Sequence, residues 1–386
     1  MGGIRGLTVL SIHSRFKSRT CVISINQLKV NMKGPGFLLS VMMIMLVMTV
    51  SCSKKNDDPQ TVTKKPYAWV AGERDSTGYG MILFSADSGE TWVRQGQGSS
   101  LLKDIDVWDI WAVDENTVWA VCSENVILKT LNGGKTWAQV PTPTYKTVPR
   151  LSSISIVNKT NIWISGSGGA VFNSTDNGNS WTVFDTNTFH NGLMQGVWAV
   201  NPQKVYVAGG VGNNNKYKGF IGYTLDGGIT WDSVSPADDY NRNEWIGVTS
   251  CGNTIVVYGG KAHYMVSTDG GGSWKNDSVL HTGGVTGADI NHMIMLNSGT
   301  WWGAFDLSEV FLTTNGGSSW VSQPAIKNGE FNVGIDSFNG KLALTVGELS
   351  GWPKKGSILK TSDGGTTWKN VHTYSCSLSK VSFIKQ

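Results

Sequence analysis

The sequence predicts an all-β protein, a seven-bladed β-propeller with four short strands in each blade. Three observations support this prediction. An eight-residue box ending in tryptophan occurs seven times, short apolar runs of strand length surround each box, and a strand that is missing at the start is supplied at the end. Repeats of about 40 to 50 residues with four strands each are typical of propellers.

The boxes set the period of the chain. They read SADSGETW, TLNGGKTW, STDNGNSW, TLDGGITW, STDGGGSW, TTNGGSSW and TSDGGTTW, and they end at Trp92, Trp137, Trp181, Trp231, Trp274, Trp320 and Trp368. Successive tryptophans are 45, 44, 50, 43, 46 and 48 residues apart. Seven copies at this spacing indicate one repeat architecture and not a set of unrelated loops.

Each repeat also contains four runs of strand character. A short apolar run precedes the box, as in MILF at 81–84, and an aromatic run lies further upstream, as in IWISG at 162–166. An alternating run comes before that, as in ISIV at 154–157, and the box tryptophan begins the fourth strand, as in SWTVF. Such runs, bounded by turn residues, are typical of β-strands.

The two ends of the repeat region complement each other. The first unit starts at Pro66 with its AWVAG strand and lacks an innermost strand, while the chain ends with SLSKVSFIKQ, an innermost strand with no unit after it. We expect the C-terminal strand to complete blade one and close the ring. Closure also removes an open sheet edge that would invite aggregation.

An apolar run of 14 residues, 37–50, follows Lys33 and precedes Ser51 and Cys52. It is too short for a comfortable membrane span and fits the hydrophobic region of a secretory signal. The ending TVSC resembles a bacterial lipoprotein processing site, which would make Cys52 the lipidated N-terminus. An ordinary signal peptide cleaved nearby is the alternative.

Three regions follow from these patterns. We expect residues 1–52 to be the signal peptide, 53–65 a flexible tether and 66–386 the propeller; residues 1–31 precede Met32, a more usual start, and need not be translated. KKNDD in the tether is similar to acidic signals that send lipoproteins to the surface of some Gram-negative bacteria, although a solvated linker has the same composition. The expected location is the Gram-negative cell envelope, as an outer-membrane lipoprotein.

Charge and cysteine content limit the partners. Residues 1–52 hold six of the 32 Lys/Arg and no acid, which leaves 26 basic against 28 acidic residues and does not favour nucleic acid. The cysteines beyond Cys52 are odd in number, lack metal-like spacing and are expected to be buried thiols: Cys122, Cys251 and Cys376. Four of the six histidines, His263, His281, His292 and His372, are isolated in the sequence, so no metal site is expected; no cofactor is expected either.

The repeated pattern Ser/Thr-x-Asp-x-Gly-x-Thr/Ser-Trp over residues 66–386 resembles the Asp-box, the bacterial neuraminidase repeat. That family includes sialidases, xyloglucan hydrolases and photosystem II assembly factor propellers. The resemblance implies that each box forms the turn between the third and fourth strands, on the rim away from the ligand face. The acid positions are Asp87, Asn132, Asp176, Asp226, Asp269, Asn315 and Asp363.

The boxes are predicted to be structural. The carboxylate of Asp176 can accept hydrogen bonds from turn amides, Gly178 can adopt positive φ, and Trp181 can fill the space between neighbouring sheets. Asparagine replaces the acid at Asn132 and Asn315. Because an amide can make the same turn but cannot act as a general acid or nucleophile, the box is not expected to be catalytic.

Ligand contacts are expected in the loops of the opposite face. The long loops are ERDSTGYG (73–80), GVGNNNKYKG (210–219), GELSGWPKKG (347–356) and PADDYNRNEW (236–245). Flat aromatics beside hydrogen-bonding groups suit sugar rings or an extended peptide. The candidate ligand-binding residues are Trp245, Trp352, Arg242, Glu244, Tyr217, Tyr79 and Arg74, with Tyr240 as a further aromatic; the alternative is that these rings hold their own loops to the scaffold.

Two functions remain open. The first is a monomeric, non-catalytic binding or assembly module for a glycan or an envelope protein. The second is a glycoside hydrolase of sialidase or xyloglucan-hydrolase type, for which two carboxyls about 5 to 10 Å apart are needed. Its carboxyls would come from Glu244, Asp289 and Glu330, and its arginines from Arg74, Arg150 and Arg242, although no Arg-Ile-Pro segment occurs.

Overall fold

The computed structural model describes residues 11–16, 19–28, 45–53, 65–184, 189, 191–213, 216–234, 244–279, 288–306, 309–323 and 330–384. The chain divides into two compact units, Met1–Lys64 and Lys65–Gln386. In the first unit, β1 (Ser11–Phe16), β2 (Arg19–Leu28) and β3 (Met45–Ser53) pair antiparallel. Among the described helices none has the length and apolar character that a membrane span requires. Processing at Cys52, within β3, stays a prediction.

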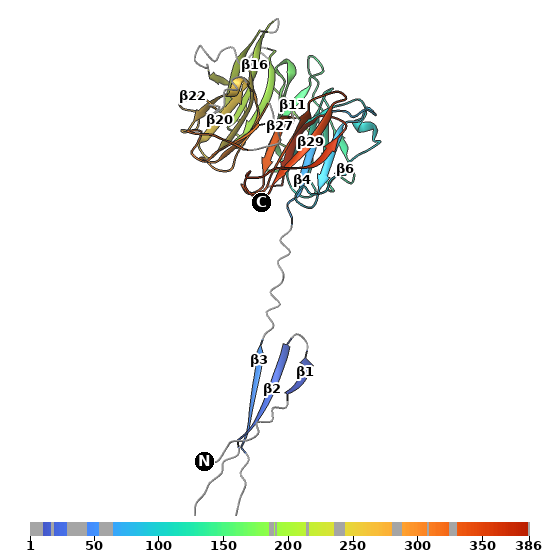
Figure 1. Ribbon diagram of the computed structural model, residues 1–386. Coiled ribbons are helices and arrows are strands. Elements are labelled where there is room, and N and C mark those ends of the chain that lie inside the picture. The colour runs from blue at the N-terminus through green and yellow to red at the C-terminus, as the bar shows by residue number, and fades with distance from the viewer. Residues whose placement is uncertain are drawn as a thin grey trace, which may run out of the picture. The chain divides into compact units, whose positions relative to one another are not determined.

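The second unit consists of seven antiparallel sheets of four strands each, seen as the upper body in Figure 1. Blade 1 is β31 (Leu378–Phe383), β4 (Ala68–Gly72), β5 (Met81–Ser85) and β6 (Val93–Arg94); blade 2 is β7 (Val107–Ala112), β8 (Val118–Cys122), β9 (Ile127–Thr130) and β10 (Ala138–Val140); blade 3 is β11 (Leu151–Val157), β12 (Asn161–Gly166), β13 (Val171–Ser174) and β14 (Thr182–Val183). Blade 4 is β15 (Leu193–Ala199), β16 (Val205–Asn213), β17 (Lys216–Thr224) and β18 (Asp232–Val234); blade 5 is β19 (Trp245–Cys251), β20 (Thr254–Gly259), β21 (His263–Ser267) and β22 (Lys275–Ser278); blade 6 is β23 (Ile290–Met295), β24 (Trp301–Phe305), β25 (Glu309–Thr313) and β26 (Val321–Gln323); blade 7 is β27 (Glu330–Ser337), β28 (Ala343–Leu349), β29 (Lys355–Thr361) and β30 (Lys369–Tyr374).

The ring closes through the two ends of the propeller. β31 pairs antiparallel with β4, with Val381 opposite Val70 and Phe383 opposite Ala68. The first strand of each blade contacts the first strand of the next, and β31 lies between β27 and β7. The predicted seven-bladed propeller, completed in blade one by the C-terminal strand, is confirmed.

The core lies between the blades. The buried apolar residues of the described propeller form seven clusters, and each cluster joins two neighbouring blades. One partly buried box tryptophan packs against each of them. Most of the largest fully buried aromatics sit instead on the second strands, as with Trp69, Trp119 and Trp163. Trp181, which was expected to fill the space between neighbouring sheets, does so only in part, because its side chain is partly exposed.

Every box forms the same hydrogen-bonded turn. In the third, the Ser174 hydroxyl donates to Asp176 Oδ1 (2.8 Å) and accepts from the Gly178 N–H (2.8 Å), while Asp176 Oδ1 accepts from the Ser180 N–H (2.9 Å). The Ser180 hydroxyl and N–H and the Ser174 hydroxyl lower the pKa of Asp176 to about 2. In the second box Asn132 makes the same contacts, and its Nδ2 donates to Thr136 Oγ1 (2.8 Å). The box is a turn scaffold, as predicted.

The box glycine explains why boxes and buried aromatics share one period. Gly178 has φ of 86°, which glycine adopts without steric cost. A Cβ at this position would also lie 2.6 Å from the indole of Trp119 on the preceding blade. Gly134 approaches Trp69, and Gly228 approaches Trp163, in the same way. Each box thus packs onto the blade before it, on the second strand in six boxes and on Tyr264 of the third strand β21 in the sixth.

The propeller has two different faces. The box turns bond to the turns between first and second strands: Gly133 N–H donates to Asn116 O (3.0 Å) and Gly227 N–H to Gln203 O (2.9 Å). These turns together form what we name the box face. The opposite face, which we name the mouth face, carries the starts of the first strands, the turns between second and third strands, and the connections between blades. This arrangement agrees with the expected separation of boxes and ligand loops.

Candidate functional site

A central channel opens on the mouth face. The first strands of the seven blades surround a cavity of about 890 Å³. Trp108, Arg150 and Gln195 line its mouth end, and Val157 and Val200 line its box end. A channel of this size can hold a small molecule or a side chain of a docked partner.

Each first strand carries an irregularity at the same place. The pairing register shifts by one residue at 107/109, 151/153, 194/196, 245/247, 290/292, 332/334 and 378/380. Such bulges re-aim side chains and are common beside active sites. The residue that follows the bulge is glycine in three blades and polar in four: Gly196, Gly247, Gly334, Asp109, Ser153, His292 and Lys380. The bulges therefore place polar groups in one ring around the channel.

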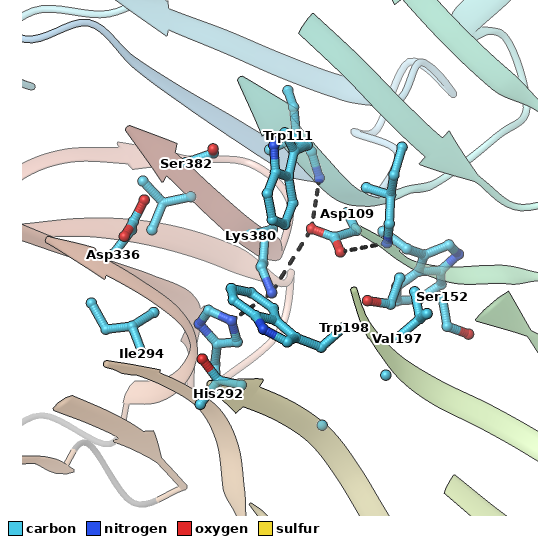
Figure 2. A pocket seen from close by; sticks show the side chains of 18 of the residues that line it. Asp109, Trp111, Ser152, Val197, Trp198, His292, Ile294, Asp336, Lys380 and Ser382 are labelled. Atoms are coloured by element: carbon cyan, nitrogen blue, oxygen red, sulfur yellow. Dashed lines mark hydrogen bonds and ion pairs between the residues drawn. The ribbon is translucent and has the colours of Figure 1, made fainter. Parts of the chain in front are cut away.

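Three of these polar residues meet inside the channel, as Figure 2 shows. Lys380 Nζ lies 2.6 Å from His292 Nε2 and 3.8 Å from Asp109 Oδ1. Asp109 accepts from the N–H groups of Ile110 (2.8 Å) and Ile154 (3.0 Å), and so pins blade 2 to blade 3. Burial raises the pKa of Asp109.

A second group lies at the mouth. The Arg150 guanidinium is 4.8 Å from the ring centre of Trp108, a cation–π contact, and it forms no ion pair within the described residues. Glu244 is half-buried, and its Oε1 has no hydrogen-bond partner among the described residues. Burial raises the pKa of Glu244, against the hydrogen bond from Gln195 and the charge of Arg150. Within the described part of the chain, this side of the mouth therefore holds polar atoms that make no hydrogen bond or ion pair, Glu244 Oε1 among them.

The opposite side of the mouth is internally paired. Lys354 Nζ lies 3.2 Å from Glu348 Oε2 and 3.6 Å from Glu73 Oε2. The Ser377 hydroxyl donates to Glu348 Oε2 at 2.5 Å. Burial raises the pKa of Glu73, while the hydrogen bond with Glu348 raises that of Lys354. These groups hold blades 7 and 1 together.

The structure corrects one predicted ligand residue. Trp245 is the first residue of β19 and is 0 % exposed in the cluster between blades 4 and 5, so it cannot serve as a surface platform. Trp352, at the turn between β28 and β29, is 89 % exposed. Arg242 lies outside the described residues, and only the backbone of Tyr217 is described, in β17.

Two further candidates serve the scaffold. Arg74 Nε lies 3.1 Å from Asp106 Oδ1, and its Nη1 donates to Asp104 O at 2.9 Å. Tyr79 packs against the cluster between blades 1 and 2 and lies under Lys103 Nζ at 4.9 Å. Both residues join blade 1 to the connection that follows it, and a role in binding stays a prediction for each.

The arginines expected of a sialidase do not converge within the described residues, whereas the candidate carboxyls Glu244 and Asp289 lie close enough that burial and the charge of Asp289 both raise the pKa of Glu244. Arg74 pairs with Asp106, Arg94 with Asp75, and Arg150 stacks on Trp108, so these three guanidinium groups do not share a target. Asp289 Oδ1 accepts from the Lys261 N–H at 2.8 Å. The side chain of Glu330 and all of Arg242 are outside the description.

Metal chemistry has no support among the residues described, because no group of three or more His, Cys, Asp or Glu could hold an ion there. Cys122 and Cys376 are buried free thiols, as predicted, whereas Cys251 is partly exposed. Burial raises the pKa of Cys376 to about 12.

Sequence reasoning did not find the contact among Asp109, His292 and Lys380. These residues are up to 271 positions apart in the chain. Each is a polar residue at the third position of a largely apolar first strand, as in VWDIWA, INHMIM and LSKVSF. Asp109 and His292 each lie 28 residues before the tryptophan of their own box, but no box follows Lys380, so this spacing could have linked only the first two.

Comparison with known proteins supports the repeat class. Residues 97–253 match the family model described as photosynthesis system II assembly factor YCF48, less than half of the chain. One similar solved structure is YCF48 bound to D1 peptide, with a sequence identity of 17 % and a TM-score of 0.52. The match covers 69 % of this chain and 80 % of the YCF48 chain. YCF48 from Cyanidioschyzon merolae is 12 % identical, with 78 % and 95 % covered and a TM-score of 0.53.

A more distant likeness is to the GH74 enzyme of Niastella koreensis, which is 14 % identical, with 79 % of this chain and 63 % of that one covered and a TM-score of 0.43. No curated protein matches the sequence. At these identities the likeness to solved structures shows the fold alone. The chain is a propeller of BNR-type Asp-box repeats, as the sequence predicted.

Proposed function

We propose that this Asp-box propeller is a non-catalytic binding module that docks a segment of a partner protein on its mouth face. The observation that carries the proposal is the group formed by Arg150, Trp108 and Glu244. Within the described residues the guanidinium has no ion pair, and the Trp108 Nε1 and Glu244 Oε1 have no hydrogen-bond partner. Buried polar groups are normally paired, so partners are expected to come from a ligand.

The chemistry of this group suits a polypeptide. A guanidinium stacked on an aromatic ring donates hydrogen bonds to carboxylate and carbonyl oxygens. A half-buried carboxyl group accepts hydrogen bonds from the N–H groups of an amide or an amine. The YCF48 structure that contains a D1 peptide supports a protein segment as the ligand class for a propeller of this repeat. The pairing of Glu348 and Glu73 with Lys354 supports a structural role for those carboxyls over a hydrolytic one.

The point where the tether enters is compatible with a lipid anchor. The Ser88 N–H of the first box donates to Pro66 O at 3.2 Å, so the chain enters the propeller on the box face. The 13 residues 53–65 reach at most about 45 Å when extended. We propose that the protein resides in the cell envelope with a lipid on Cys52.

The lipid anchor has a direct test. Labelled palmitate is expected to be incorporated into the protein in cells, and Cys52→Ala is expected to abolish the label, because only the thiol of the processed N-terminus accepts the diacylglycerol. Cys251→Ala, which removes a partly exposed thiol of the propeller, serves as control and should retain it. Label that persists in the Cys52 variant would contradict the lipoprotein assignment.

Site-specific photocrosslinking tests the docking face. Val148 is 67 % exposed in the connection between blades 2 and 3 on the mouth face, and Ile229 is 85 % exposed in the fourth box on the box face. With a photoreactive residue at each position in turn, we expect a protein adduct in cells from position 148 and none from 229. Arg150→Gln should reduce the adduct about tenfold or more, since arginines are frequent hot spots, while Lys135→Gln on the box face leaves it unchanged.

Three results would argue against the proposal. Equal adducts at both positions would mean that the mouth face is not selective. An adduct that survives complete proteolysis of the partner would indicate a glycan, for which the exposed Trp352 is the best placed platform. If the Arg150 variant gave as much adduct as the unchanged protein, Arg150, Trp108 and Glu244 would not form part of the binding site.

A further inference from the structure

The channel interior contains a cation that the docking proposal does not use. Lys380 projects from β31 with 22 % of its side chain exposed, and it lines the cavity. A Cβ on Gly334 would lie 3.0 Å from Lys380 Cα, so glycine in blade 7 leaves the room through which Lys380 reaches His292 in blade 6. The side chain of Lys380 therefore extends from blade 1 past blade 7 and reaches blade 6.

The proton positions around Lys380 follow from its chemistry. An ammonium can only donate, so His292 Nε2 accepts at 2.6 Å and the imidazole is neutral there. Its proton then lies on Nδ1, which is 2.9 Å from Ile335 O and 3.2 Å from Ile335 N, and the carbonyl oxygen is the partner that this tautomer selects. A second ammonium proton faces Asp109 Oδ1 at 3.8 Å, beyond hydrogen-bond distance. The ammonium thus keeps hydrogen-bonding capacity for another acceptor.

The carboxylates of the channel wall are already engaged. Asp109 accepts from two backbone N–H groups, and Asp336 accepts from the N–H groups of Ser337 (2.8 Å) and Phe383 (2.8 Å). Their charge is therefore partly balanced by backbone dipoles. Burial also raises the pKa of Asp109, against the charge of Lys380 and the two backbone hydrogen bonds. Among the described residues that line the channel beside Asp109 and His292, Lys380 is therefore the cation that can bind a further anion.

Two more features complete a site. The Ser152 hydroxyl lines the same cavity, is buried and has no hydrogen-bond partner among the described residues. The rings of Trp111 and Trp198 lie 5.8 Å apart between blades 2 and 4, and the Trp198 Nε1 is held by Ser250 Oγ at 2.7 Å. Figure 2 shows these rings beside Lys380 and Asp109. A cation and a free hydroxyl thus adjoin an aromatic wall.

We propose that the channel interior binds a small organic carboxylate, whose oxygens contact Lys380 Nζ and Ser152 Oγ and whose apolar body lies along Trp111 and Trp198. Val197 and Ile294, which also line the cavity, extend the apolar wall. The site is separate from the group of Arg150 and Trp108 at the mouth and does not depend on a docked protein. The alternative is that Lys380 only braces blades 1, 2 and 6.

Protection of Lys380 in the unmodified protein tests the proposal without any substitution. Straight-chain carboxylates from acetate to octanoate serve as probes, and the rate of reductive methylation of each lysine is followed by mass spectrometry. We expect a member of the series to slow methylation of Lys380, whereas hexanol does not, and Lys159 at the box end of the channel reacts at an unchanged rate. Absence of protection by every carboxylate would overturn the proposal, as would equal protection by hexanol.

Titration calorimetry on variants tests which residues contact the bound carboxylate. Lys380→Met should weaken binding of the protecting carboxylate about tenfold or more, as expected for loss of a charge-assisted hydrogen bond, and Lys159→Met should not. Ser152→Ala retains the ion pair with Asp109 and keeps the test valid if Lys380→Met fails to fold; it should weaken binding several-fold. Unchanged affinity in Ser152→Ala and in a folded Lys380→Met would overturn the site. Neither readout involves the crosslinks at position 148, so either proposal can fail alone.

Discussion

Removal of residues 377–386 is expected to leave no stably folded propeller. The deletion takes away β31, whose Leu378, Val381 and Phe383 are buried between blades 7 and 1. It also removes two hydrogen bonds to the neighbouring blades. Phe383 N–H donates to Asp336 Oδ2, and Ala112 N–H donates to the Ser382 hydroxyl at 3.2 Å. Both neighbours of the strand, β27 and β7, lose contacts at once.

The magnitude decides this outcome. Deleting a large buried side chain costs about 2 to 5 kcal/mol, so three such losses amount to roughly 6 to 15 kcal/mol. A typical domain is stable by only about 5 to 15 kcal/mol. The truncated chain should therefore show no cooperative thermal transition, or one at a far lower temperature, by circular dichroism.

A shorter deletion provides the matched control. Removal of residues 385–386 leaves β31 and the Ile384 N–H bond to Tyr67 O (3.2 Å) in place and should melt like the full chain. If the protein without residues 377–386 melts within a degree or two of the intact one, the terminal strand does not close the ring.

The fold could be predicted because its determinants are local and repeated. Each box needs only the hydroxyl, carboxyl or amide, and glycine of one short segment, as in Ser174, Asp176 and Gly178. The aromatic runs recur with the same period because in six of the seven boxes the glycine packs on the second strand of the preceding blade. Asn132 could be recognised as equivalent to Asp176 for the same reason.

The site was less predictable because its contacts are not local. Trp245 was assigned to a loop, yet the strand begins at that residue, and a shift of one residue at a strand boundary moves a side chain from surface to core. The contact between His292 and Lys380 depends on ring closure and on Gly334, which no single segment reveals. Candidates in long loops, such as Trp352, could be placed on a face but not given partners.

The buried aromatics of the second strands are expected to matter more than the box tryptophans that define the repeat. Trp163 is fully buried, stacks on Phe184 at 5.3 Å and meets Trp231 edge-on at 6.1 Å. The box glycine Gly228 of the next blade lies against the same indole. Trp163→Ala should therefore open a cavity between blades 3 and 4 and destabilise the protein by about 3 to 5 kcal/mol.

Trp181→Ala is the matched comparison. Its indole is half-buried against the cluster between blades 2 and 3, and its Nε1 donates to Pro141 O at 2.9 Å. Because water can fill much of the space that it leaves, we expect a loss of only about 1 to 2 kcal/mol. Urea unfolding of both variants, followed by far-ultraviolet circular dichroism so that loss of a fluorophore does not matter, should give the larger shift of the midpoint for Trp163→Ala. Equal shifts would mean that the box tryptophan carries as much of the interblade packing as the second strand does.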